Sequence, residues 1–278
     1  MNPNIRRSHI QTIRCGVPAH RSAVVGKLYP TDHGYTLVLS GTGPVAAPSS
    51  MFHAPWGRHT EEIAHLKIGE GITEIGASAF SSLRNLTSAE LPSTLLRIYS
   101  EAFRGCRELH SMHFPDRLEY IGPAAFYRCL TLRSVSFGTG LRVIESEAFK
   151  GCAQLEQALF PEHTRKIGGS AFEGCLALSE LQLPKDITRI YPNTFRLCSN
   201  LRQVAIPQKV CSIEDQAFAK CSSLEILNLQ RAENLRLLHA SSFSNCLSLK
   251  KILINASQRQ LVLYHFPTCS KLIETGVS

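Results

Sequence analysis

Large apolar side chains recur along this chain at a fixed spacing, and phenylalanine marks the repeat most clearly. Successive phenylalanines stand 23 residues apart from Phe80 to Phe218, and the next interval, to Phe243, is 25 residues. The repeated positions are Phe80, Phe103, Phe126, Phe149, Phe172, Phe195, Phe218, Phe243 and Phe266. A period of this length indicates a solenoid, in which one structural unit stacks on the next.

Two further apolar positions keep the same period. An isoleucine or leucine precedes each phenylalanine by five residues, as at Ile144, and a leucine follows it by six, as at Leu155. From that leucine the pattern runs Leu-x-x-apolar-x-apolar, and proline ends several of these segments, as at Pro184. The segment alternates as a strand does, and proline cannot donate the next ladder hydrogen bond. Each unit is therefore expected to form one short strand that pairs in parallel with the next, while isoleucine and phenylalanine line the opposite wall.

The chain is expected to divide into three parts. Residues 1–34 show no period and are assigned no fold, residues 35–62 are interpreted as an N-terminal cap, and residues 63–278 as the solenoid. The cap is expected to contain a strand that begins near Tyr35. Trp56 is expected to close the stack in place of a missing phenylalanine.

Two segments depart from the regular repeat. A two-residue insertion lies within residues 230–234, and this loop is expected to project from the edge of the sheet beside Ile226 and Asn228. The last unit, built around Phe266 and Cys269, is expected to be a truncated coil. Insertions in repeat proteins often build the binding side, although a neutral surface loop is an equal alternative.

Residues 121–137, with the sequence IGPAAFYRCLTLRSVSF, resemble one repeat of the BspA-like leucine-rich repeat family. The resemblance extends over about residues 35–278, through nine matching units. It implies an α/β repeat fold: a right-handed leucine-rich-repeat solenoid of about nine to ten 23-residue coils, with a parallel β-sheet on its concave face. It also implies an adhesin or a host- or matrix-binding surface protein of the bacterial type.

The charge distribution argues against nucleic acid as the partner. The chain of 278 residues has a net charge of +8, and residues 1–60 hold six of the basic residues against one acid, Asp32. The repeats themselves therefore carry little excess charge and show no basic stripe along a working surface.

Targeting signals give no consistent location. No stretch approaches the roughly 20 apolar residues that span a bilayer, so no membrane span is expected. Four arginines (Arg6, Arg7, Arg14 and Arg21) interrupt the N-terminal segment, and no standard secretory signal is visible. The family resemblance favours a secreted or surface location, whereas the missing signal favours a cytoplasmic one.

Eight of the ten cysteines follow a repeat phenylalanine by three residues, from Cys106 to Cys269. In stacked coils they form a ladder whose side chains point in parallel directions, which suits neither a disulfide nor a convergent metal site. They are interpreted as small buried thiols. Cys15 and Cys211 lie off the ladder, and Cys211 is the candidate for an exposed thiol.

No residue pattern predicts catalysis, a cofactor or a bound metal. His65, His110 and His113, with Glu90 between them, occupy outward strand positions, where a metal or pH-sensing site is the less favoured alternative to simple solvation. No spacing of serine, histidine and aspartate suggests a nucleophilic triad. The chain is therefore expected not to be an enzyme.

The outward positions of the strands form the expected binding surface. Charges on it nearly balance, and Leu159 and Ile226 add apolar contact, which suits a protein partner better than a polyanion. The residues expected to bind the partner are Lys67, Glu90, His110, His113, Arg133, Glu156, Leu159, Glu180, Arg202, Glu225, Ile226 and Asn228.

Two hypotheses for the function follow. In the first, the chain is a secreted or surface-associated adhesin or host-interaction factor that binds a protein on its concave face. In the second, it is an intracellular scaffold or a translocated effector without catalytic activity. A monomer is favoured in both.

Overall fold

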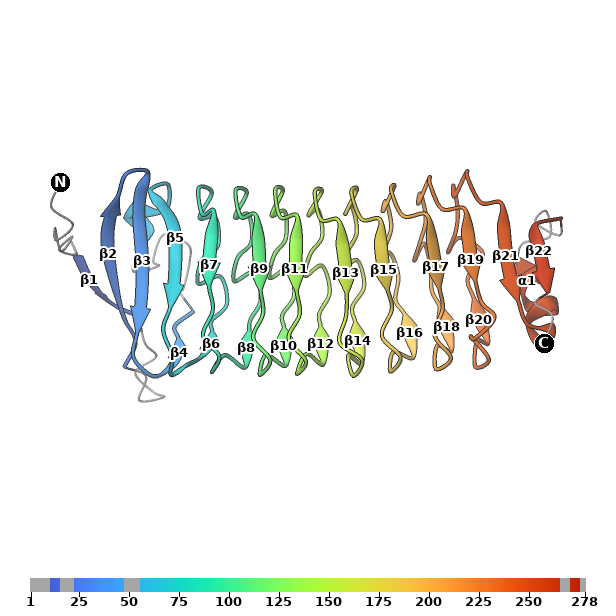
Figure 1. Cartoon of the computed structure of the whole chain (residues 1–278), viewed down its shortest axis with the longest axis horizontal. Helices are drawn as coiled ribbons and strands as arrows, with labels where there is room; N and C mark the ends of the chain where they lie inside the picture. Colours follow the sequence, from blue (N-terminus) through green and yellow to red (C-terminus); the bar gives the residue numbers. More distant parts are fainter. Residues whose placement is uncertain (1–10, 16–22, 48–55, 266–270, 276–278) are drawn as a thin grey trace, which may run out of the picture.

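The computed structural model of this chain describes residues 11–15, 23–47, 56–265 and 271–275. The repeats stack along the long axis of the molecule, and each contributes one strand to a long row (Figure 1). The strands of this row are β5 (Ile63–Ile68), β7 (Ser88–Glu90), β9 (Ser111–His113), β11 (Ser134–Ser136), β13 (Gln157–Leu159), β15 (Glu180–Gln182), β17 (Gln203–Ala205), β19 (Ile226–Asn228) and β21 (Lys251–Ile254). We call the surface that they present the strand face.

Neighbouring strands of the row are parallel and keep the repeat in register. Met112 of β9 lies opposite Val135 of β11, and Val204 of β17 lies opposite Leu227 of β19, with the expected offset of one repeat. These central residues point into the coil, whereas the residues on either side point outward. The predicted parallel-strand solenoid is thus confirmed.

A second row of short strands runs along the wall where the isoleucine positions lie. Its strands are β6 (Ile72–Ile75), β8 (Arg97–Ile98), β10 (Tyr120–Ile121), β12 (Val143–Ile144), β14 (Lys166–Ile167), β16 (Arg189–Ile190), β18 (Ser212–Ile213) and β20 (Leu237–Leu238). They pair in parallel from one coil to the next, as Ile121 does with Ile144, except between β14 and β16. Tight turns and these short strands, rather than helices, complete each repeat.

The phenylalanines form a column of stacked rings inside the solenoid. Successive ring centroids are 5.1–5.7 Å apart from Trp56 to Phe243. Trp56 is 1% exposed and stacks on Phe80, so it occupies the position that the sequence assigned to it. The column is the continuous core that no single repeat could bury alone.

Each phenylalanine lies in a turn that links its coil to the next one. Around Phe149 the backbone adopts positive φ at Glu147 (59°) and at Gly151 (76°). The amide N–H of Phe149 then donates to the carbonyl oxygen of Ala171 in the next coil, at 2.8 Å. The same bond joins Phe172 to Thr194 and is found along the column. We call this series of hydrogen bonds between the turns of neighbouring coils the turn ladder. It joins the coils along the third side of the solenoid.

The described part of the N-terminal region extends the sheet. Strand β3 (Gly34–Ser40) pairs in parallel with β5, and β2 (Val25–Thr31) pairs with β3 in the antiparallel direction. Strand β1 (Gln11–Arg14) continues this sheet beyond β2, and β4 (Gly43–Val45) starts the second row. Two strands, β1 and β2, therefore lie in residues 1–34, where no fold was expected because the sequence shows no period.

The C-terminal end departs from the expected truncated coil. After β21 the chain forms a 3-10 turn (Ala256–Gln258) and a helix, α1 (Arg259–His265), before β22 (Ile273–Thr275) pairs with β21. The amide N–H of Asn255 donates to the side-chain oxygen of Gln258 at 3.2 Å, which fixes the start of the turn. Phe266 and Cys269 lie outside the described residues.

Candidate functional site

The strand face brings the predicted site residues together as three parallel rows. One row contains Lys67 opposite Glu90, Ser136 opposite His113, and Leu159 opposite Gln182. A second contains Glu180 and Ile226 at the first position of their strands, and the third consists of the residues just before each strand. Nine of the twelve predicted residues are exposed, while Glu225, Ile226 and Asn228 are half-buried. The rows are a surface rather than a pocket.

Several charges on this face neutralise one another. Lys67 Nζ lies 3.1 Å from Glu90 Oε2, and Lys250 Nζ lies 3.3 Å from Glu225 Oε2, in each case across neighbouring coils. Arg133 donates to Gln154 at 3.0 Å. These pairs are exposed, so each contributes little to stability, and a partner can replace them at small cost.

The histidines on the strand face are partnered by serine rather than gathered into a site. His65 Nδ1 lies 2.8 Å from Ser88 Oγ, and His113 Nδ1 lies 2.8 Å from Ser136 Oγ. Glu90, which lies between them in sequence, is engaged by Lys67. Within the described residues, no three histidine, cysteine or acidic side chains are arranged to hold a metal ion.

The fold does bring aspartate, histidine and serine together at one place, which sequence spacing did not reveal. Ser241 Oγ donates to Asp215, and His239 Nδ1 lies 2.8 Å from Ser241 Oγ and 3.4 Å from Asp215 Oδ1. A nucleophilic triad places histidine between the other two groups, with a different ring nitrogen toward each. Here one nitrogen contacts both, and the serine donates to the carboxylate. The cluster is a turn network rather than a nucleophilic site.

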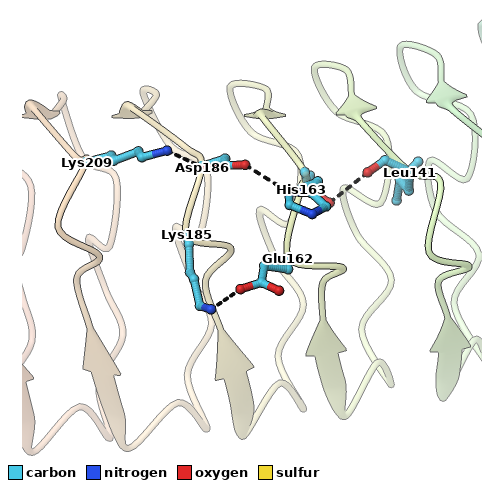
Figure 2. A network of polar contacts seen from close by, with 7 residues as sticks. Leu141, Glu162, His163, Lys185, Asp186 and Lys209 are labelled. Carbon is cyan, nitrogen blue, oxygen red and sulfur yellow. Dashed lines mark hydrogen bonds and ion pairs between the residues drawn. The ribbon is translucent and has the colours of Figure 1, made fainter.

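A second polar network crosses the turns that follow the strands. Lys209 Nζ lies 2.6 Å from Asp186 Oδ1, and His163 Nδ1 lies 3.2 Å from Asp186 Oδ2, while Lys185 pairs with Glu162 (Figure 2). Hydrogen bonding by Lys209, then by His163, lowers the pKa of Asp186. The Asp186 carboxylate is thus held between Lys209 and His163 at the edge of the strand face.

The cysteine ladder is a buried column from Cys106 to Cys221, as the sequence indicated, and Cys246 at its end is half-buried. Cys106, Cys152 and Cys198 are fully buried, and the thiol of each donates to a phenylalanine carbonyl in the preceding coil, at 3.3, 3.2 and 3.4 Å respectively. Burial raises the pKa of the Cys106 and Cys198 thiols well above the usual range. These thiols therefore lack the thiolate character that reactive cysteines need.

A bulky thiol reagent is expected to modify Cys211 of the native protein and to spare the buried ladder cysteines from Cys106 to Cys198. Cys211 is exposed, whereas Cys15, the other off-ladder cysteine, is 1% exposed and burial raises its pKa to about 11. Mass spectrometry after labelling without denaturant checks this. Rapid modification of Cys152 or Cys175 would show that the coils are not packed as described.

Among the described residues, no helix has the length and apolar character to cross a bilayer.

Comparison with known proteins identifies relatives of the repeat. The family described as "BspA type Leucine rich repeat region (6 copies)" matches residues 58–175 and 142–273. A leucine-rich repeat protein from Bacteroides ovatus is 19% identical, with a TM-score of 0.58 over 82% of this chain and 69% of that one. A leucine-rich repeat protein from T. pallidum is 18% identical, with a TM-score of 0.37 over 95% of this chain and 100% of that one. No curated protein matches the chain. At these identities the structural likeness shows the fold alone.

Proposed function

Because this chain belongs to the BspA-type leucine-rich repeat family, we propose that it is a protein-interaction module whose strand face binds a protein partner. Solenoids of this kind typically serve as non-catalytic binding scaffolds. The stack presents a continuous row of exposed side chains on nine strands, which no single repeat offers. This extended surface is the observation that carries the proposal.

The chemistry of the face favours protein over polyanion. Acidic and basic side chains alternate along it, and some already pair, as Lys67 does with Glu90. Leu159 is 48% exposed in the middle of the row, and Ile226 is half-buried beside Arg202 and Glu225. Mixed charge around apolar side chains is the composition of protein interfaces, whereas nucleic acid requires a net basic surface.

Capture of a protein by the immobilised chain tests this proposal. Extracts of candidate host cells supply the partner, and a variant with a disrupted strand face serves as the control. Once purified, the partner is expected to bind saturably to the wild type. If every captured protein is retained equally by the variant, the strand face is not the working surface.

The family resemblance extends the proposal to an adhesin or host-interaction factor that acts outside the producing cell. The alternative is an intracellular scaffold or translocated effector. Fusion of residues 1–34 to a reporter distinguishes these two hypotheses, because an adhesin or host-interaction factor needs a route out of the cell. Export of the fusion by the native host is expected. Retention, with a reporter carrying a known signal exported in parallel, would favour the intracellular reading.

A further inference from the structure

Among the described coils, the bond that precedes each strand of the strand face is missing at one junction, between β15 and β17, which is also one of three junctions, with β7–β9 and β11–β13, where neighbouring strands are not paired as a sheet. In the other coils, the residue just before the strand donates its amide N–H to the equivalent carbonyl one coil earlier. The donors are Thr87, His110, Arg133, Glu156, Ser179, Glu225 and Lys250. Within the described residues Arg202 makes no such bond to Ser179, and β15 and β17 do not pair. The turn ladder remains intact there, since Phe195 still donates to Ala217 at 2.8 Å.

A groove of about 480 Å³ lies at this junction. Its apolar part comes from the ends of the two unpaired strands and the residues after them, namely Leu181 and Leu183 on one side and Ile206 and Pro207 on the other. The size is within the roughly 300–1,000 Å³ of sites that hold small ligands or side chains. The groove is therefore large enough to hold a side chain of a partner.

Three basic side chains lie on the rim of the groove, and two of them are already paired, Lys185 with Glu162 and Lys209 with Asp186. Lys185, Lys209 and Arg231 line it, against the single acid Asp186. Asp186 is already engaged by Lys209 and His163 (Figure 2). Arg231 is exposed and forms no ion pair within the described part of the chain. An anionic group on a ligand would therefore find an available guanidinium beside an apolar floor.

Arg231 reaches the groove because of the two-residue insertion. The backbone of this loop is fixed on both sides of Arg231: Gln258 donates to the carbonyl of Ala232 at 2.6 Å, and Asn255 donates to that of Gln230 at 3.2 Å. Ala232 is fully buried. The insertion thus forms an anchored loop that presents Arg231, rather than a neutral surface bulge.

We propose that the groove between β15 and β17 binds an extended acidic segment of the protein partner, with an apolar side chain on the half-buried Leu181 and Pro207 and a carboxylate at Arg231. The proposal rests on the proposed function and names the chemistry of the partner. Charge complementarity selects this occupant: Glu162 and Asp186 already engage Lys185 and Lys209, which leaves the guanidinium of Arg231 without an ion pair among the described residues beside the apolar part of the groove. A nucleic acid would need a longer basic track.

A fluorescent synthetic peptide that alternates leucine and aspartate tests the inference by anisotropy. The wild-type chain is expected to bind it, and Arg231→Glu is expected to weaken binding by about tenfold or more. Arg107→Glu, at an exposed arginine in a distant turn, is the matched control and is expected to change binding by less than about twofold. Circular dichroism of both variants verifies the fold.

Three results would overturn the groove assignment. They are no binding of the acidic peptide, equal loss in the two variants, or equal binding of a peptide with lysine in place of aspartate. A fourth result would also overturn it. If an oligonucleotide binds more tightly than the acidic peptide, the ligand of the groove is a polyanion instead. If the peptide does not bind while a captured partner still depends on the strand face, only the groove inference fails. If the peptide binds at Arg231 but no partner depends on the strand face, the proposed function fails instead.

Discussion

Replacement of Phe149 by alanine is expected to lower the free energy of unfolding by about 3–5 kcal/mol. The ring is fully buried and stacks between Phe126 and Phe172, with centroids 5.2 Å away on each side. The edges of Phe114 and Phe137 close the same cavity. Because the turns on both sides are bonded to their neighbours, the coil cannot collapse around the missing ring. Denaturant titration followed by circular dichroism measures the loss.

Tyr264→Ala provides the aromatic control for that measurement. Tyr264 is 80% exposed on α1, so its replacement is expected to cost no more than about 0.5 kcal/mol. Equal losses at Phe149 and Tyr264 would contradict the stacked column. Long repeat arrays do not always unfold in one step, so the comparison uses the first transition of each variant.

Reversal of the strand face beside β17 and β19 is expected to abolish partner binding, with a loss of about a hundredfold or more. The variant combines Arg202→Glu, Glu225→Lys and Ile226→Asp. Arg202 is exposed, Glu225 and Ile226 are half-buried, and Glu225 forms an ion pair only with Lys250. The fold is expected to survive, because none of the three side chains lies in the core and substitutions outside the core cost about 0.5 kcal/mol each. Titration of the purified partner by calorimetry measures the change.

The matched control carries the same kinds of change on the second row. It combines Glu119→Lys, Arg142→Glu and Leu237→Asp, at three exposed positions beside β10, β12 and β20. Glu145 and Lys150 are left unchanged in this control variant. Each forms an ion pair, Glu145 with Lys166 and Lys150 with Glu173, so their replacement would also remove a stabilising contact. Loss of binding in this control, with retention in the strand-face variant, would place the working surface on the opposite wall.

The repeat could be predicted from sequence because each of its signals is local and recurs. The phenylalanine period specifies the column, and the alternation around Met112 specifies which side of each strand is buried. Trp56 could be placed because it stands next to the position where the repeat would otherwise have a phenylalanine. Burial of the ladder cysteines could be predicted because each follows a repeat phenylalanine by three residues.

The remaining features depend on contacts that a period does not encode. From β8 onward the strands of the second row have only two residues, too short to leave an alternating pattern. Burial of Cys15 depends on β1 and β2, whose segment has no repeat to align. The groove arises where Arg202 fails to bond to Ser179, a break between two coils whose sequences both fit the repeat. The sequence located the inserted loop but could not show that it places Arg231 over this groove.

Lysine footprinting of the chain in complex with its purified partner tests the central claim most directly. The strand face carries Lys67, Lys250 and Lys251, whose side chains are 59%, 70% and 40% exposed. Two lysines away from the strand face serve as internal controls: Lys166 on the second row and Lys220 in the turn that follows Phe218. The account predicts that the partner slows reductive methylation on the strand face and leaves Lys166 and Lys220 unchanged. Protection of Lys166 and Lys220 with unaltered modification of the strand-face lysines would contradict it.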